Sequence, residues 1–409
     1  MGIVTSSFAW LDHSEKERRR MAEIISLFRD RDILDELGVG SIRDWALSEL
    51  LFPGTSTVQT RARYLLFVPW TYLEIERQRI SAAEVADNVR DMHVDLVAAL
   101  TKGGERSSGV IGAQAGRNLR QLPNTIYWRG LRVFGIHQTT RTVEQYHRSL
   151  DGYYRALSNA PSLEGDERAI GEVRPNWDAV PPPPNRWRKK TTFDLRPKES
   201  EYLLHQIATQ VPDSLLAFLV RRGTPVADIA APWLDPDLAA YPERLRTQID
   251  HARNFAQVMQ GALLLYELLL AEAAGRDDLR DKHIGRLDEW HEGYKGALLT
   301  WDRPAFWTLV RSVNPSISPS TELFVERWAD LVANNSEALY KCGAARTAII
   351  EREHRLKRRL ARLTNPEALK SWSGNEGATL FRYRWTRVKS IVGDILKGLG
   401  APEEEAADA

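Results

Sequence analysis

The chain has 409 residues, 27% of which are charged, and a formal net charge of +1 at pH 7. A chain of this length has room for roughly two or three domains and can bury a large core without disulfides or metals. A net charge this close to zero excludes a polycationic coat for nucleic acid, so any basic function must come from a local patch.

Cysteine content and apolar patterning restrict the class of protein further. The single cysteine, Cys342, excludes a disulfide framework and a cysteine-based zinc site. The N-terminus has no apolar signal core, and no apolar stretch approaches the length of a membrane span. We therefore expect a cytoplasmic protein without membrane contact.

The first strong helix signal ends at a proline-glycine pair. Ser41 and, three positions later, Asp44 are typical of the N-cap and the third residue of a helix. Apolar residues then recur at helical spacing, which predicts a helix over residues 42–52. Pro53 and Gly54 should end it, because proline cannot donate to the helical ladder and glycine tolerates a positive φ. We assign Asp44, Pro53 and Gly54 a structural role.

The next helix is expected to begin near residue 57 and to lie in the core, because its sequence is apolar on every side. Arg61 and Arg63 enter this apolar segment, where a guanidinium group needs an anion for its donors. An internal network with carboxylates such as Asp44 and Glu49 is the ordinary interpretation, and the two arginines are then structural. A clamp for a phosphate is the alternative.

Residues 110–142 have the outline of a helix-turn-helix or winged-helix unit. Helical patterns over about 110–119 and 124–135 flank a break at 121–123, and the polar stretch 137–142 would be a short strand or wing. Such units place one helix in the major groove of DNA and hold phosphates with neighbouring residues. Protein contacts by a winged helix and ordinary bundle structure are the alternatives.

The second helix of this unit has two different faces. Tyr127, Leu131 and Phe134 recur at positions i, i+4 and i+7 and should face the core. The opposite face is polar, basic and aromatic, and arginines before the turn would hold backbone phosphates. The predicted DNA contacts of the unit are Arg117, Arg120, Thr125, Trp128, Arg129 and Arg132.

Composition changes between residues 158 and 196, where prolines are frequent and four are consecutive at 181–184. Consecutive prolines favour polyproline II, so we interpret residues 158–196 as a semi-rigid linker between two domains. Its basic end is a further candidate for contact with nucleic acid through charge and stacking. The alternative is that Trp177 and Trp187 pin the segment to a domain surface. The candidate contacts here are Arg188, Lys189 and Lys190.

Residues 197–400 are predicted to form a helical bundle. A long helix over residues 245–270 keeps apolar residues at three-and-four spacing, which is typical of a central bundle helix. A later helix over about 344–363 carries arginines at i, i+3, i+7 and i+10, which would form one stripe able to follow phosphates. A solvated face paired with nearby glutamates is the alternative. The stripe consists of Arg352, Arg355, Arg359 and Arg362. Residues 401–409 are expected to be an acidic, disordered tail.

Four separated motifs resemble an uncharacterised bacterial family that is known only as a domain of unknown function. They lie at residues 7–12, 51–64, 126–131 and 383–385. The resemblance implies that relatives tend to be encoded near helicases and other anti-phage defence components. It therefore implies a role in a DNA-directed defence assembly. No catalytic residue is defined for the family, so none can be carried over.

The usual catalytic and metal-binding signatures do not occur in this sequence. It has no phosphate loop, no nucleophile elbow and no zinc framework.

Taken together, these patterns predict a mainly α protein, in which a helical domain with a winged-helix-like unit, residues 1–157, precedes the bundle. The predicted function is a DNA-binding or adaptor subunit of an anti-phage assembly. It would bind double-stranded DNA and partners such as a helicase, with no catalysis, metal or cofactor of its own. The alternative is a metal-dependent nuclease or other nucleic-acid hydrolase with dispersed Asp, Glu and His residues.

Overall fold

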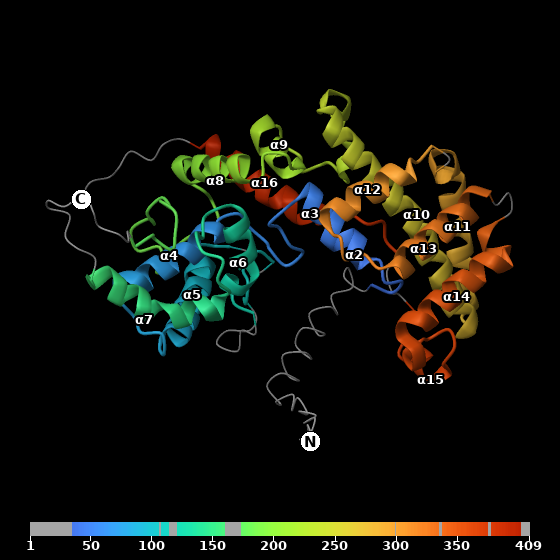
Figure 1. Cartoon of the computed structure of the whole chain (residues 1–409), viewed down its shortest axis with the longest axis horizontal. Coiled ribbons are helices and arrows are strands. Elements are labelled where there is room, and N and C mark those ends of the chain that lie inside the picture. The colour runs from blue at the N-terminus through green and yellow to red at the C-terminus, as the bar shows by residue number, and fades with distance from the viewer. Residues whose placement is uncertain are drawn as a thin grey trace, which may run out of the picture. The chain divides into compact units, whose positions relative to one another are not determined.

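The computed structural model describes residues 35–105, 108–113, 121–159, 173–298, 300–334, 338–374 and 378–401. Within these ranges the chain is mainly helical, as the sequence predicted, and helices are joined by loops without any β-strand (Figure 1). The one pairing of extended backbone among the described residues is an isolated antiparallel bridge between His137 and Trp177.

Two compact units make up the chain. Unit 1 contains residues 1–42 and 253–381, and unit 2 contains residues 43–252 and 382–409. The division differs from the one that composition indicated at residues 158–196, since the described part of that segment belongs to unit 2.

Unit 2 is a helical unit in which the long buried helix α4 packs against α5 and α6, and α8 packs against α9 and α16. Its elements are η1 (Arg43–Leu47), α3 (Ser48–Leu51), α4 (Tyr64–Arg77), α5 (Val85–Lys102), α6 (Pro123–Val133), α7 (Val143–Asn159), α8 (Pro197–Gln210), α9 (Leu215–Arg222), η3 (Pro232–Leu234), η4 (Leu238–Ala240) and α16 (Trp385–Leu399).

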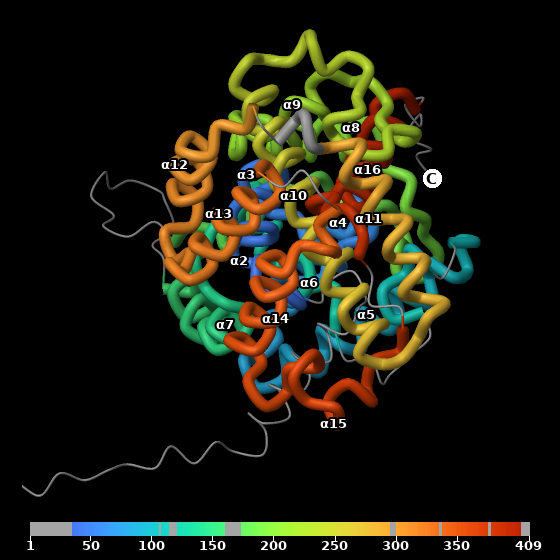
Figure 2. The backbone as a smooth tube through the Cα atoms, turned by 90° about the vertical axis from the view of Figure 1, so that its right-hand side faces the viewer, coloured from blue at the N-terminus to red at the C-terminus, as the bar shows by residue number. Residues whose placement is uncertain are grey.

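Unit 1 is a helical bundle in which α13 packs against both α11 and α14 (Figures 1 and 2). Its elements are α2 (Gly40–Ile42), α11 (Asp277–Leu298), α12 (Arg303–Val313), α13 (Pro319–Asn334), η5 (Leu339–Lys341), α14 (Gly343–Lys357), η6 (Arg358–Leu360) and α15 (Pro366–Leu369). Helix α10 (Glu243–Ala273) begins in unit 2 and continues into unit 1.

The long helix expected over residues 245–270 is present as α10. Its apolar positions at three-and-four spacing are buried along the whole length. In unit 1, the Trp328 indole donates to the Val258 carbonyl at 2.9 Å and the Trp290 indole to the Gln257 carbonyl at 2.8 Å. These bonds satisfy the polar atoms of two large side chains that fill the space around α10.

The helix expected over residues 42–52 is present as the consecutive elements α2, η1 and α3, and its start was predicted wrongly. The Asp35 carboxylate accepts hydrogen bonds from the amides of Val39 and Gly40 at 2.6 and 2.7 Å. Asp35 therefore caps this helix in place of Ser41, which lies inside α2. A π-helical stretch over η1 was not expected from the sequence.

The corner after α3 lies directly against α6. Gly54 has φ +75°, and a Cβ there would approach the Phe134 ring to 2.9 Å. A Cβ on Gly130 would come within 2.6 Å of the Gly54 carbonyl oxygen. The two glycines thus allow backbone and helix to approach at this point, and Gly54 supplies the left-handed conformation that the corner requires.

Helix α4 begins at Tyr64, later than the sequence predicted, and it is buried through Tyr72 as a core helix should be. The segment before it is held by side chains instead of helical bonds. The Tyr127 hydroxyl accepts from the amides of Thr60 and Arg61 at 2.8 and 3.1 Å and donates to the Arg61 carbonyl at 2.8 Å. This phenol therefore connects α6 to the start of α4.

Arg61 and Arg63 are both paired inside unit 2, although not with the carboxylates nearest in sequence. Arg61 donates through Nε and Nη2 to the two carboxylate oxygens of Asp394 at 2.9 and 2.7 Å. Arg63 donates to the fully buried Glu199 at 3.0 Å and to the Thr192 carbonyl at 3.0 Å. These contacts pair each guanidinium group with a carboxylate and join α8 and α16 to the start of α4. Asp44 pairs with its neighbour Arg43 instead.

Candidate nucleic-acid interface

A buried cluster of aromatic rings lies between α4, α6 and α7 in unit 2. Tyr72 stacks on Trp177 with centroids 5.4 Å apart, and Trp128 meets Trp177 edge-on at 5.7 Å. His137 lies 4.4 Å from the Trp128 ring, and Tyr146 closes the cluster at 5.5 Å from Trp128. The cluster fixes the loop after α6 and the segment around Trp177 to the helices.

A polar network runs through the same cluster. The Glu76 carboxylate accepts from the Tyr146 hydroxyl and from the Asn176 amide at 3.0 Å, while the Trp177 indole donates to the Tyr146 hydroxyl at 3.0 Å. Burial raises the pKa of Glu76, and the three neighbouring hydrogen bonds act in the opposite direction. The network satisfies polar groups under the surface and holds Asn176 and Trp177 in place.

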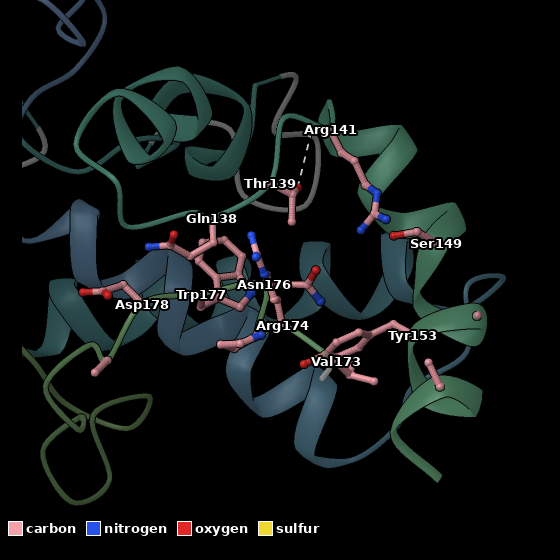
Figure 3. A pocket seen from close by; sticks show the side chains of 14 residues that line it. Gln138, Thr139, Arg141, Ser149, Tyr153, Val173, Arg174, Asn176, Trp177 and Asp178 are labelled. Carbon is pink, nitrogen blue, oxygen red and sulfur yellow. Dashed lines mark hydrogen bonds between the residues drawn. The ribbon is translucent and has the colours of Figure 1, made fainter. Parts of the chain in front are cut away.

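A pocket of about 980 Å³ opens above this cluster. Its walls are the loop after α6, the outer side of α7 and the segment 173–179 (Figure 3). Figure 3 shows Arg141 directed toward Ser149 on α7, with Thr139 beside it and Tyr153 on the same helix wall. The principal polar and aromatic lining residues are Gln138, Thr139, Arg141, Ser149, Tyr153, Arg174, Asn176 and Trp177.

Positive charge gathers at this pocket. Arg141 and Arg174 line it, and neither guanidinium makes a hydrogen bond or ion pair with any residue in the described ranges. Arg132, at the end of α6, is likewise exposed and unpaired within those ranges. Burial, together with the charges of Arg132 and Arg141, lowers the pKa of His137 to about 4. His137 is therefore neutral at pH 7, and the excess charge on this face comes from arginines.

The residues predicted on α6 divide into exposed and buried positions. Thr125, Arg129 and Arg132 are exposed, as the face opposite Tyr127 requires. Trp128 is only 6% exposed, so the expectation that it shares their face is wrong. It is covered by the loop after α6 and donates to the Arg141 carbonyl at 2.9 Å.

The other predicted features of the helix-turn-helix unit have mixed outcomes. Residues 137–142 form no strand beyond the bridge at His137, and α7 begins immediately afterwards, so the expected wing is not present in the described chain. Arg117 and Arg120 lie outside the described residues. Arg129 donates to Glu49 at 2.6 Å, so part of its charge is already compensated.

The basic end of the proline-rich segment is held against unit 2. Trp187 is buried and stacks on Phe67 with centroids 5.7 Å apart, and Arg188 pairs with Glu74 at 2.8 Å. Lys189 and Lys190 are exposed. The segment therefore contributes two exposed ammonium groups to the surface. Its tryptophans are buried, which agrees with the alternative that Trp177 and Trp187 hold the segment against a domain surface.

The arginine stripe predicted over residues 344–363 does not exist as one helical face. Helix α14 ends at Lys357, where Arg358 adopts φ +50° and the chain continues as a short 3₁₀ turn. Arg352 is only 4% exposed, and its guanidinium donates to the carbonyls of Leu37 and Gly38 at 2.8 and 2.9 Å. Arg362 lies 3.4 Å from Glu36. Two of the four arginines are thus held within unit 1, Arg352 buried and Arg362 half-buried, and Arg355 and Arg359 remain exposed.

The sequence did not single out Arg141, Arg174, Ser149 or Tyr153. Arg141 lay in the stretch interpreted as a wing and Arg174 in the segment interpreted as a linker. No local spacing connects positions so far apart in the chain. The one usable signal was Trp177, since a tryptophan in a proline-rich segment that packs back brings its polar neighbours to the same surface.

Two further properties concern the described ranges as a whole. Within them, no group of three or more His, Cys, Asp or Glu side chains is arranged to hold a metal ion. None of the helices that the structure describes has the length and apolar composition needed to cross a bilayer.

Fold and site together define a mainly helical protein with a basic pocket above a buried aromatic cluster. The chain belongs to the family of unknown function DUF6361, which matches residues 5–398. Comparison with curated proteins and with solved structures finds no match.

Proposed function

We propose that this chain is a DNA-binding or adaptor subunit of a larger assembly, without catalysis of its own, and that unit 2 binds the DNA. The observation that carries the proposal is the group of arginines Arg132, Arg141 and Arg174, which have no acidic partner among the described residues. Arginine side chains of this kind attract phosphates and release condensed counterions when they bind them.

The exposed face of α6 extends this basic region. Thr125 supplies a hydroxyl donor and Arg129 a second charge on the same helix as Arg132. Contacts from arginine and hydroxyl side chains to phosphate oxygens position a protein on DNA, and base contacts add sequence preference. The surface therefore supports binding to the backbone of double-stranded DNA.

A second surface, in unit 1, supports the adaptor role. Leu356 and Leu360 are exposed, and each directly follows an exposed arginine in the chain, Arg355 and Arg359 respectively. Apolar side chains flanked by cations fit an acidic partner surface with apolar residues of its own. The motifs noted in the sequence suggest that such a partner, a helicase among others, belongs to an anti-phage defence assembly. That setting is part of the proposal.

Fluorescence anisotropy of a labelled duplex, titrated with the full chain at two salt concentrations, tests the proposal. We expect binding that weakens as salt increases, and intact DNA after incubation with Mg²⁺ or Mn²⁺. Absence of binding at low salt would remove the proposal. Metal-dependent cleavage by the pure chain would replace it with the nuclease alternative.

A further inference from the structure

The pocket in unit 2 brings two guanidinium groups, both without partners in the described chain, next to an aromatic wall. Arg141 enters it from the loop after α6, Arg174 from the segment 173–179, and Tyr153 from α7 (Figure 3). We propose that this pocket binds a nucleoside monophosphate, either free or as the 5′-phosphorylated end of a nucleic-acid strand. Where the ligand is a strand end, the inference rests on the proposed function and specifies which part of the DNA the pocket receives.

The charge of the pocket matches a phosphomonoester. Two guanidinium groups carry two positive charges, and a phosphomonoester carries about −1.5 to −2 at pH 7. The planar fork of arginine donors fits phosphate oxygens, and Thr139 adds a hydroxyl to the same wall. The one acidic lining residue, Asp178, accepts from the Tyr202 hydroxyl at 3.0 Å and from Gln206, both on α8. These neutral donors hold the Asp178 carboxylate against α8, and it forms no ion pair with Arg141 or Arg174 in the described chain.

The size and the aromatic wall of the pocket match a base. At about 980 Å³ the pocket is at the upper end of the range of small-molecule sites, so a base, a sugar and a phosphate fit together. Tyr153 is half-buried and lines the pocket, where its ring offers a base the kind of stacking surface that aromatic platforms provide. The network of Glu76, Asn176 and Trp177 keeps the floor rigid, which reduces the ordering cost of binding.

Two pairs of variants test the two halves of the ligand. Arg141→Gln with Arg174→Gln removes the phosphate contacts, and Arg148→Gln, an exposed arginine on α7 outside the pocket lining, is the matched control. Tyr153→Leu removes the stacking ring, and Tyr153→Phe keeps it. Thermal unfolding of each variant verifies that it is folded, which is expected because these side chains are exposed or half-buried.

Calorimetry with deoxyadenosine monophosphate, deoxythymidine monophosphate and inorganic phosphate measures binding of the free ligand. Anisotropy of a short single strand with either a 5′-phosphate or a 5′-hydroxyl measures binding of the strand end. We expect the double arginine variant to bind about 100-fold more weakly, about tenfold for each guanidinium removed, where tenfold corresponds to about 1.4 kcal/mol. Tyr153→Leu should weaken nucleotide binding but not phosphate binding, and both controls should bind as the unchanged chain does.

The outcomes distinguish a strand end from a free nucleotide as the ligand, and they test the pocket proposal separately from the proposed DNA-binding function. Tighter binding of the phosphorylated strand identifies a strand end, whereas binding of mononucleotides without that preference identifies a free nucleotide. If neither binds, or if the double arginine variant equals Arg148→Gln, the pocket proposal is overturned. It is also overturned if phosphate binds as tightly as the nucleotides and Tyr153→Leu has no effect. Duplex binding that persists in these cases leaves the proposed function intact, and nucleotide binding without duplex binding removes the proposed function alone.

Discussion

Alanine substitutions at and near the Gly54 corner separate the energetic cost of crowding against α6 from the energetic cost of backbone strain. Gly54→Ala introduces both costs, because φ is +75° and the new Cβ would lie 2.9 Å from the Phe134 ring. Gly104→Ala introduces strain alone, since φ is +87° and no atom of the described chain lies within 4 Å of its Cβ. Gly130→Ala introduces the close approach alone, at 2.6 Å from the Gly54 carbonyl oxygen.

The size of each effect follows from these differences. A non-glycine residue in the left-handed region costs about 1–2 kcal/mol. Overpacking in a well-filled core costs about 1–3 kcal/mol. In both alanine variants at positive φ, the new methyl group also reduces the conformational entropy of the unfolded chain. This favours the folded state by about 0.4–1 kcal/mol and partly offsets the strain equally in the two variants. Gly54→Ala should therefore lower the free energy of unfolding by about 1–3 kcal/mol more than Gly104→Ala does, through the packing cost.

Urea unfolding followed by tryptophan fluorescence measures the three free energies. Gly130→Ala should also lower the free energy of unfolding, by about 1–3 kcal/mol, because its Cβ would crowd the Gly54 carbonyl oxygen, a second contact at the same corner. Equal stability of Gly54→Ala and Gly104→Ala would refute the reasoning, since the packing of the corner against α6 would then carry no cost.

Two further predictions concern buried polar side chains, and a third concerns exposed arginines. His93 is fully buried, neither ring nitrogen has a hydrogen-bond partner among the described residues, and burial lowers its pKa to about 3. Its contribution to stability is complete above the unfolded pKa of about 6.5 and is lost as pH falls toward 3. The chain should therefore lose about 2 kcal/mol between pH 7 and pH 5, and His93→Phe should remove most of that loss in urea titrations at the two pH values. Arg352→Gln should destabilise unit 1 by about 3 kcal/mol or more in the same unfolding assay, because several buried acceptors lose a charged donor. Charge reversal of Arg355 and Arg359 should leave the melting temperature within a few degrees of the unchanged chain and abolish capture of an acidic partner, and unfolding of the reversed variant would place these two side chains in an internal ion-pair layer.

Periodicity was sufficient to predict the long helices, and α10 shows why. Its apolar residues recur every three or four positions over many turns, and a pattern of that length has few other structural solutions. The same reasoning failed at Trp128, which occupies the side of α6 opposite the core face. Trp128 itself is buried because the loop after α6 folds back over it, while Thr125, Arg129 and Arg132 stay exposed. No pattern within the helix reports a covering segment from elsewhere in the chain.

The partners of charged residues were even less accessible from the sequence. Arg61 was assigned correctly to an internal network, but it pairs with Asp394, which lies more than three hundred positions away. Arg352 belonged to a regular spacing, yet that spacing assumed a helix that ends before Arg359. The pocket arginines Arg141 and Arg174 come from two non-helical segments. Spacing rules apply within an element, whereas these sites are assembled between elements.

The salt dependence of duplex DNA binding tests the central claim most directly. The test compares the unchanged chain with Arg129→Gln combined with Arg132→Gln, and uses Arg246→Gln, an exposed arginine on α10, as the matched control. The logarithm of the binding constant is plotted against the logarithm of the salt concentration between about 50 and 200 mM. We expect the double variant to bind more weakly and the slope to flatten by roughly 1 for each phosphate that it no longer binds, with no change for the control. An unchanged affinity and slope in a folded double variant would contradict the assignment of α6 to the DNA interface.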